Sequence, residues 1–290
     1  YVVASQYGEI VAKRIYDGKT QLNIAFQPLV QAAQQTLQST PEQRARTILR
    51  VDSGAGSVED VNWALEQGYQ FHGKDYSGRR AENLAESVTE WFTDPCDADR
   101  QMGWVTEPND LYKRPVKRIA VRCRKNNGQW GTGVILSTLS DRDVLLLTGQ
   151  SPDLETQPQA VILAYVRFYD QRGGGVEIEI KEDKQGLSTT KRNKKRFAAQ
   201  QMVCQLEALA HNLLVWARNW LAPFAAKIAN FGMLRMVRDI LHITGKVELT
   251  EHHHIRKIVL NSADPFTKFI QPGLASLLAH EQVVICSGEI

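Results

Sequence analysis

An aspartate separates an apolar strand pattern from a glycine loop in the segment "RTILRVDSGAGS". The apolar residues of 46–51 run together, which is typical of a buried strand, and Asp52 would stand at its carboxyl end. Sheets flanked by helices bind ligands outside the carboxyl ends of their strands, so Asp52 could ligate a metal ion there. An aspartate before Ser-Gly also caps turns, and the sequence leaves both interpretations open.

The glycine loop fits none of the common nucleotide or nucleophile motifs. A dinucleotide fingerprint requires G-x-G-x-x-G, but Glu59 stands where its third glycine belongs. No lysine follows the loop as a P-loop requires, and no glycines flank Ser53 at the spacing of a nucleophile elbow, G-x-S-x-G. These mismatches argue against a nucleotide-using α/β enzyme.

A second group of reactive side chains occurs at helical spacing in "YDQRGGGVEIEIKEDK". Tyr169 and Arg172 are three residues apart, while Lys181 and Lys184 follow Glu177 by four and seven residues. Residues three or four apart share one face of a helix. The alternation in "VEIEI" is also typical of a plain strand, and Tyr169 could be a half-buried core residue.

Positive charge is concentrated immediately after this group. Residues 181–197 hold seven Lys or Arg against two acids, although the net charge of the whole chain is only +3. Such a strip neutralises phosphates, and a carboxylate beside it can hold a metal ion, so a phosphodiester substrate is indicated. A solvated charged face is the other interpretation. The strip contains Lys181, Lys184, Lys191, Arg192, Lys194 and Lys195.

Together the two stretches resemble one family, the DDE transposases of bacterial insertion sequences. "RVDSGAGS" is similar to their second-aspartate segment, and "YDQRGGGVEIEIKEDK" is similar to their Tyr-Arg-Glu-Lys signature. The spacings Tyr169 to Arg172 and Glu177 to Lys184 match that signature, and the spacing Arg172 to Glu177 is one residue longer. The helix pattern "LEALAHNLLVWAR" is also similar, so the resemblance covers roughly residues 1–222.

The resemblance implies an RNase H-like fold and DNA cleavage with strand transfer at insertion-sequence ends. Asp52 and Glu177 would be the catalytic residues and would bind Mg²⁺, or Mn²⁺ in its place. Tyr169, Arg172 and Lys184 would hold the transposon end, and the remaining basic residues of the strip would contact DNA. The first catalytic aspartate is expected upstream of Tyr1, so the chain as given is expected not to cleave DNA.

The resemblance also implies the protein's partners and location. The expected partners are transposon ends, target DNA and a second copy of the chain, as a homodimer in a synaptic complex. No membrane is expected, and the protein would lie in the bacterial cytoplasm at the nucleoid. The alternative function is a catalytically inactive, DNA-binding remnant of a transposase. The composition is compatible with both the transposase and the remnant. No apolar run reaches the roughly 18 residues of a membrane helix. The four scattered cysteines form no CxxC pair. The "HHH" at 252–254 is expected in an exposed turn rather than around one ion.

The elements expected to position these residues form an α/β layer. Strands are predicted at 1–6, 9–16 and 46–51, a capped helix begins at Val58, and "YQFHGK" is a further strand. We expect four regions: 1–75 as the first part of the catalytic core, 76–155 as a β-rich insertion, 156–222 as the rest of the core, and 223–290 as a mixed helical region. Within these regions we expect a helix at 81–92, a loop near 94–115, strands at 116–125, 129–139, 143–149 and 255–260, and helices at 159–172 and 197–221.

Overall fold

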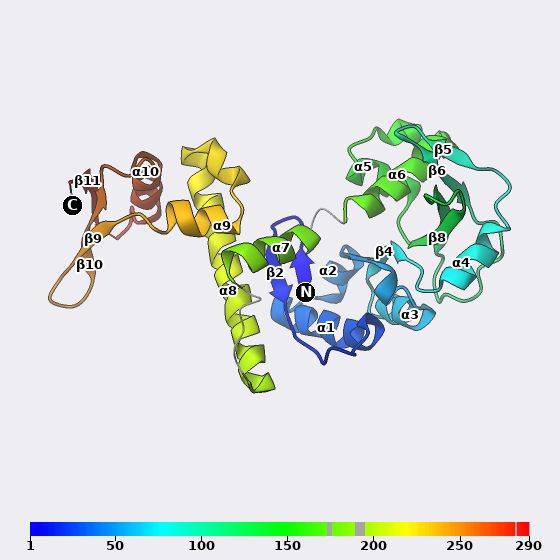
Figure 1. Ribbon diagram of the computed structural model, residues 1–290, viewed down its shortest axis with the longest axis horizontal. Helices are drawn as coiled ribbons and strands as arrows, with labels where there is room; N and C mark the ends of the chain where they lie inside the picture. Colours follow the sequence, from blue (N-terminus) through cyan, green and yellow to red (C-terminus); the bar gives the residue numbers. More distant parts are fainter. Residues whose placement is uncertain (173–175, 189–194, 282, 290) are drawn as a thin grey trace. The chain divides into compact units, whose positions relative to one another are not determined.

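The structure is a computed structural model that describes residues 1–172, 176–188, 195–281 and 283–289. The chain forms two compact units (Figure 1). The first, here called the sheet unit, comprises Tyr16–Val176 and Val2. The second, the helical unit, comprises Tyr1, Val3–Ile15 and Glu177–Ile290. Each unit is described by itself below.

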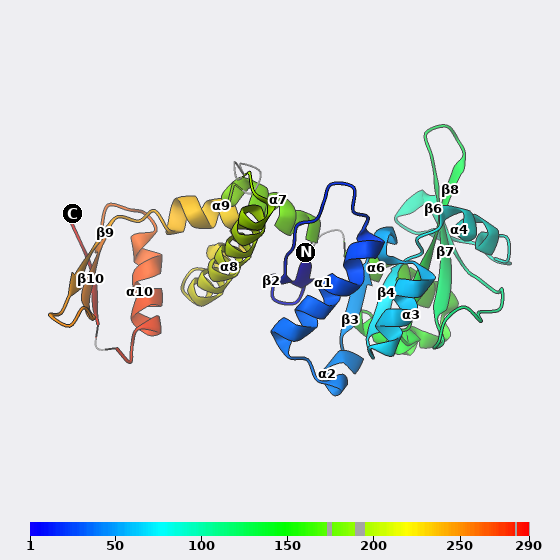
Figure 2. The same cartoon turned by 90° about the horizontal axis from the view of Figure 1, so that it is seen from below.

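A six-stranded mixed sheet is the centre of the sheet unit. Its first pair is parallel, and every further pair is antiparallel, so the strands after β4 extend the same sheet. Figure 2 shows the long strands β6, β7 and β8 side by side. In sheet order the strands are β3 (Ile48–Val51), β4 (Gln70–Lys74), β8 (Trp130–Ser137), β7 (Lys117–Arg124), β6 (Asp97–Trp104) and β5 (Phe92–Asp94).

Helices cover both faces of this sheet. On one face, α5 (Asp141–Leu147) and α6 (Pro158–Asp170) bury Val144, Ile162 and Tyr165 against Ile119 and Ile135. On the other, α3 (Val58–Glu66) and α4 (Gly78–Ala85) bury side chains against Phe71 and Leu136. The long helix α1 (Leu22–Leu37) packs on α3, where Phe26 meets Trp63 edge to face, and the short α2 (Pro41–Ala45) follows it. The predicted mixed sheet covered by helices is therefore confirmed. The strands expected in it at 1–6 and 9–16 instead form a two-stranded sheet of their own.

Local sequence signals explain several of these boundaries. The Ser57 hydroxyl accepts the Asp60 backbone N–H at 3.1 Å, which confirms the predicted cap of α3. Strands β7 and β8 form the predicted hairpin, and Gly128 takes a left-handed φ of +78° in its turn. The helix predicted at 197–221 is α8 (Phe197–Leu221).

Other expectations for this part of the chain are wrong. The segment 143–149, expected to be a strand, lies largely in helix α5, because Ser140 caps it and two acids stand in its first turn. The helix expected at 81–92 ends at Ala85. The loop expected near 94–115 contains β6, which pairs with β7 along much of its length.

The helical unit is built around α8. A small hairpin of β1 (Val2–Ala4) and β2 (Glu9–Ala12) lies against α8, where the Asn212 side chain hydrogen-bonds both backbone groups of Ile10 (Figure 1). Helix α7 (Val176–Gly186) precedes α8, so the strand interpretation of "VEIEI" is wrong. After α8 come α9 (Met233–Arg235), α10 (Thr267–Leu277) and a three-stranded sheet of β9 (Gly245–Leu249), β10 (Ile255–Asn261) and β11 (Val284–Gly288). No helix in the described ranges is long and apolar enough to cross a membrane.

Four charged side chains are buried together where the hairpin meets α7 and α8. Lys13 Nζ lies 3.2 Å from Asp183 Oδ2 and 3.3 Å from Glu207 Oε2. His211 Nδ1 lies 2.7 Å from Asp183 Oδ1. We call Lys13, Asp183, Glu207 and His211 the buried ion cluster. It joins segments far apart in sequence, so it stabilises the helical unit only while its charges balance.

The state of His211 makes the stability of the chain depend on pH. Its Nδ1 faces the Asp183 carboxylate and its Nε2 lies 2.9 Å from the Gly8 carbonyl oxygen, and only an imidazolium donates at both nitrogens. Burial lowers the pKa of His211, but the hydrogen bonds and charge of Asp183 and Gly8 outweigh it and raise the pKa above its ordinary value. The stability that this imidazolium contributes is complete below about pH 6.5 and is lost as pH rises through the raised pKa.

We therefore expect the denaturant midpoint of the full chain to fall as pH rises above about 6.5. Urea unfolding at a series of pH values measures this. His211→Gln should remove most of the pH dependence, whereas His280→Gln, at an exposed position, should preserve it. The same dependence in wild type and His211→Gln would show that His211 is not charged in the folded chain.

Candidate functional site

Asp52 follows the last residue of β3 and is exposed to solvent. Its Oδ1 accepts the Gly54 backbone N–H at 2.9 Å, so the turn-capping interpretation is confirmed. This hydrogen bond uses one carboxylate oxygen, and in the described part of the chain Asp52 makes no ion pair. Capping and ligand binding are therefore compatible at this residue.

Tyr169, near the end of α6, lies within reach of the charge of Asp52, and Arg172 lies beside Tyr169. The Arg172 guanidinium is 4.9 Å from the Tyr169 ring centroid, and its Nη2 donates to Tyr169 Oη at 3.4 Å. Burial raises the pKa of Tyr169, the negative charge of Asp52 raises it further, and Arg172 opposes both. The Tyr169 hydroxyl therefore stays protonated at neutral pH and can donate a hydrogen bond.

Arg50 also belongs to this group of side chains, although the sequence did not predict it as a site residue. It precedes Asp52 by two residues, and residues two apart on a strand face the same side of the sheet. Its guanidinium is 4.3 Å from the Phe168 ring centroid, and Nη2 donates to the Phe168 carbonyl oxygen at 2.7 Å. We call Arg50, Asp52, Phe168, Tyr169 and Arg172 the strand-end cluster.

A buried histidine lies beneath the strand-end cluster. His72 is paired with Arg50 across β3 and β4, and its ring centroid is 4.9 Å from that of Phe168. Burial, assisted by the positive charge of Arg50, lowers the pKa of His72 to about 3. His72 is therefore neutral at physiological pH. It packs against the aromatic side chains of the cluster and is not positioned as an acid or base catalyst.

The acidic residues of helix α7 differ in what their side chains contact. On its inner face, Glu179 lies 3.4 Å from His211, and Asp183 belongs to the buried ion cluster. Glu182 Oε2 accepts the Met233 backbone N–H at 2.7 Å. Glu177 is exposed, and among the described residues its side chain makes no ion pair or hydrogen bond. Glu177 is therefore the acid of α7 that remains available to a ligand.

The basic residues are only partly described. Lys181 and Lys184 are exposed on α7, on the same helix face as Glu177, and Lys195 is exposed just before α8. Lys191, Arg192 and Lys194 lie outside the described residues. Their contact with DNA stays a prediction. The histidines at 252–254 are exposed in a turn, as expected.

The metal site stays a prediction as well. Asp52 belongs to the sheet unit and Glu177 to the helical unit, so the distance between their carboxylates stays untested. Within the described ranges, no three His, Cys, Asp or Glu side chains form a group that could hold an ion. Mg²⁺ prefers oxygen ligands, and Asp52 supplies one carboxylate. A metal pair fits the strand-end cluster only with Glu177 and a further carboxylate added.

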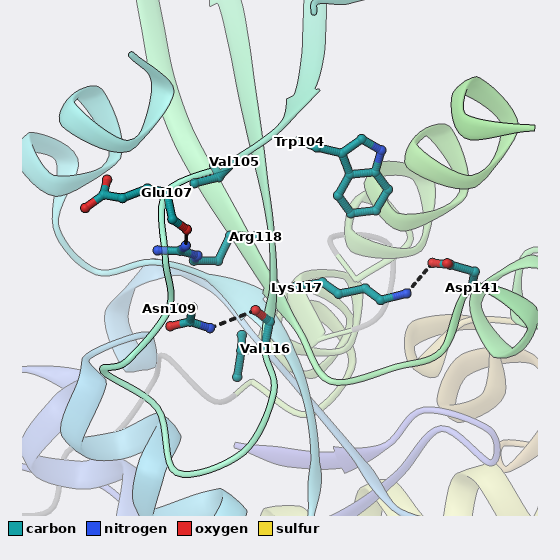
Figure 3. Close-up of a pocket in the computed structure, with 8 residues that line it drawn as sticks. All are labelled: Trp104, Val105, Glu107, Asn109, Val116, Lys117, Arg118 and Asp141. Atoms are coloured by element: carbon teal, nitrogen blue, oxygen red, sulfur yellow. Dashed lines mark hydrogen bonds and ion pairs between the residues drawn. The ribbon is translucent and has the colours of Figure 1, made fainter. Parts of the chain in front are cut away.

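One pocket of about 410 Å³ lies elsewhere in the sheet unit (Figure 3). Its polar groups largely satisfy one another: Lys117 pairs with Asp141, Arg118 donates to the Glu107 carbonyl, and Asn109 Nδ2 donates to the Val116 carbonyl. None of its lining residues belongs to the strand-end cluster. Its walls offer few free polar groups to a substrate. The lining residues are Trp104, Val105, Glu107, Asn109, Val116, Lys117, Arg118 and Asp141.

The strand-end cluster thus combines an exposed carboxylate, a protonated phenol and two guanidinium groups. A carboxylate can ligate a metal ion, and one guanidinium group can bind two oxygens of a phosphate at once. This combination suits a phosphodiester substrate better than an uncharged one. No family model and no curated protein sequence matches the chain, so the functional argument rests on these residues.

Proposed function

We propose that this chain is a DDE transposase with an RNase H-like catalytic core, which cleaves DNA at insertion-sequence ends and joins it to target DNA. The meeting of Asp52 with Tyr169 and Arg172 supports this most directly. The two segments that resemble the family are far apart in sequence, and Asp52 of one and Tyr169 and Arg172 of the other belong to one cluster. The parallel pair β3 and β4, joined through α3, places Asp52 at a strand end where α/β sheets bind ligands.

The residues then have separate roles in the reaction. Asp52 and Glu177 would hold Mg²⁺ or Mn²⁺, which when bound activates the attacking oxygen and stabilises the leaving oxygen. Arg172 suits two-point contact with a phosphate, while Lys184 acts as a point charge. Tyr169 donates from a hydroxyl that stays protonated. These three residues orient the DNA end, and Glu177 and Lys184 share the exposed face of α7.

Nicking of a supercoiled plasmid tests the proposal without knowledge of the recognised ends. The proposed function requires that the acids of this chain complete the metal site. Against the expectation from the resemblance, it therefore predicts that the chain nicks DNA only with Mg²⁺ or Mn²⁺ present, and that Asp52→Asn abolishes nicking while DNA binding persists. The control is Asp97→Asn, at an exposed carboxylate in β6, which should nick like wild type. Metal-dependent nicking that survives Asp52→Asn would contradict the assignment of Asp52.

A second function, DNA binding without catalysis, is favoured by two observations. Asp52 already caps a turn, and the described residues hold no group of three acids or other metal ligands. This remnant of a transposase would bind DNA and leave plasmids intact under all metal conditions. A chain that neither binds nor nicks DNA would contradict both functions.

The basic strip should bind DNA mainly through phosphates. Replacing Lys191, Arg192, Lys194 and Lys195 with Gln should weaken binding to all sequences and make the plot of log K against log salt shallower by up to about 3–4, at roughly 0.9 per phosphate contact. Fluorescence anisotropy at several salt concentrations measures this slope.

A control with the same loss of charge separates local contact from general attraction. It carries Gln at the exposed positions Arg46, Arg79, Lys125 and Arg142. We expect its slope to stay near that of wild type. Equal changes in both quadruple variants would mean that the strip is only a solvated charged face.

A further inference from the structure

Two arginines of the strand-end cluster each stack on one of two consecutive aromatic residues. Arg50 stacks on Phe168 at 4.3 Å, and Arg172 stacks on Tyr169 at 4.9 Å, measured from guanidinium carbon to ring centroid. Stacking on a ring fixes the plane of a guanidinium group. Both guanidinium planes are therefore fixed, one on a residue of β3 and one on a residue that follows α6.

In the described part of the chain no acid, Asp52 of the same cluster included, forms an ion pair with either arginine. The Nε of Arg50 and that of Arg172 are each buried there without a hydrogen-bond partner. Burial lowers the pKa of Arg50, and the charge of Arg172 lowers it further, so the guanidinium groups repel each other. Buried unsatisfied donors are uncommon and call for an explanation such as a missing ion.

We propose that Arg50 and Arg172 together bind one phosphodiester group of the DNA, with Arg50 as a substrate-positioning residue that the sequence does not reveal. One phosphate would remove the repulsion and supply oxygens to both guanidinium groups. Asp52 follows Arg50 by two residues, just past the end of β3, so we expect the bound phosphate to lie near that carboxylate. The assignment to DNA rests on the proposed function.

Thermal unfolding of the full chain tests the anion site directly. Inorganic phosphate should raise the Tm of wild type more than sodium chloride does at equal ionic strength, because a ligand of the folded state stabilises it. Arg50→Lys and Arg172→Lys should lose this extra increase, since lysine keeps the charge and lacks the planar fork. Arg46→Lys, at an exposed arginine before β3, is the matched control and should retain it.

Binding of a short single-stranded oligonucleotide then tests whether the two arginines share one phosphate. Each lysine substitution should weaken binding about tenfold, the loss expected for one charged hydrogen-bonded contact. Because both contacts serve the same phosphate, the double variant should lose much less than the hundredfold expected for independent sites. If Arg50→Lys does not fold, Arg172→Lys alone must still abolish the phosphate effect.

The outcomes separate this inference from the proposed function. An equal effect of phosphate and chloride on wild type, or independent losses in the double variant, overturns the shared site, even if the chain nicks plasmids. A phosphate effect that requires both arginines supports the site, even if nicking fails and the proposed function falls. Binding of phosphate without binding of the oligonucleotide overturns the assignment to DNA.

Discussion

Lys13→Met should lower the free energy of unfolding by about 3–5 kcal/mol, the usual cost of removing one partner from a buried ion pair. Lys13 is almost fully buried, and its ammonium contacts both Asp183 and Glu207. In the buried ion cluster Lys13 lies between these two carboxylates, and His211 faces Asp183 from the other side. Without Lys13 the carboxylates face a single cation in a medium that solvates them poorly.

Arg14→Met is the matched control for this substitution, because Arg14 is the next residue and its side chain is exposed. It should change the free energy of unfolding by less than about 0.5 kcal/mol. Urea unfolding of both variants near pH 6, where His211 is charged, gives the comparison. Equal and small losses for Lys13→Met and Arg14→Met would show that the cluster contributes little to stability.

Glu177→Gln should reduce metal-dependent nicking about 10³-fold and leave stability unchanged. A catalytic metal supplies several kcal/mol of charge stabilisation, and each loss of about 1.36 kcal/mol slows a reaction tenfold. Glu177 is exposed, and among the described residues its side chain makes no ion pair or hydrogen bond that Glu177→Gln would break. Initial rates of plasmid nicking, measured beside thermal unfolding, give both quantities.

Glu182→Gln, on the same helix, should give the opposite result. Glu182 accepts the Met233 backbone N–H, and a neutral amide accepts that bond less strongly. We expect lower stability and nearly normal nicking at a temperature where the variant is folded. If Glu182→Gln abolished nicking and Glu177→Gln did not, the assignment of Glu177 as the metal-binding acid of α7 would be wrong.

Sequence reasoning was reliable where local signals and tertiary packing agree. The cap at Ser57, the Asn-Asn-Gly turn after β7 and the apolar pattern of α8 each specify a boundary through nearby residues. It failed at α5, where "DVLLLTG" is apolar enough for a strand and the deciding cap, Ser140, precedes it. At "VEIEI" the sequence left a helix face and a strand open, because the alternation of two residue types also suits a strand, and the structure forms helix α7 there.

The candidate site was predictable only in part. Asp52, Tyr169 and Arg172 could be selected by residue type and spacing, and the structure brings these three together. Arg50 was missed, although its place two residues before Asp52 puts it on the same side of a strand. The buried ion cluster was not predictable at all, since Lys13 lies 170 residues from Asp183 and meets it only through the packing of α7 and α8 on the hairpin.

The central proposal is that Asp52 and Glu177 bind the same metal ions when the chain is bound to DNA. Fe²⁺ in place of Mg²⁺, with ascorbate and hydrogen peroxide, generates hydroxyl radicals that cut the protein backbone close to the metal. With the DNA-bound chain, the account predicts cuts in two segments, around residue 52 and around residue 177. Both should disappear in Asp52→Ala, in Glu177→Ala and with excess Mg²⁺. Cuts in only one of the two segments, or cuts that persist in either variant, would contradict a shared metal site.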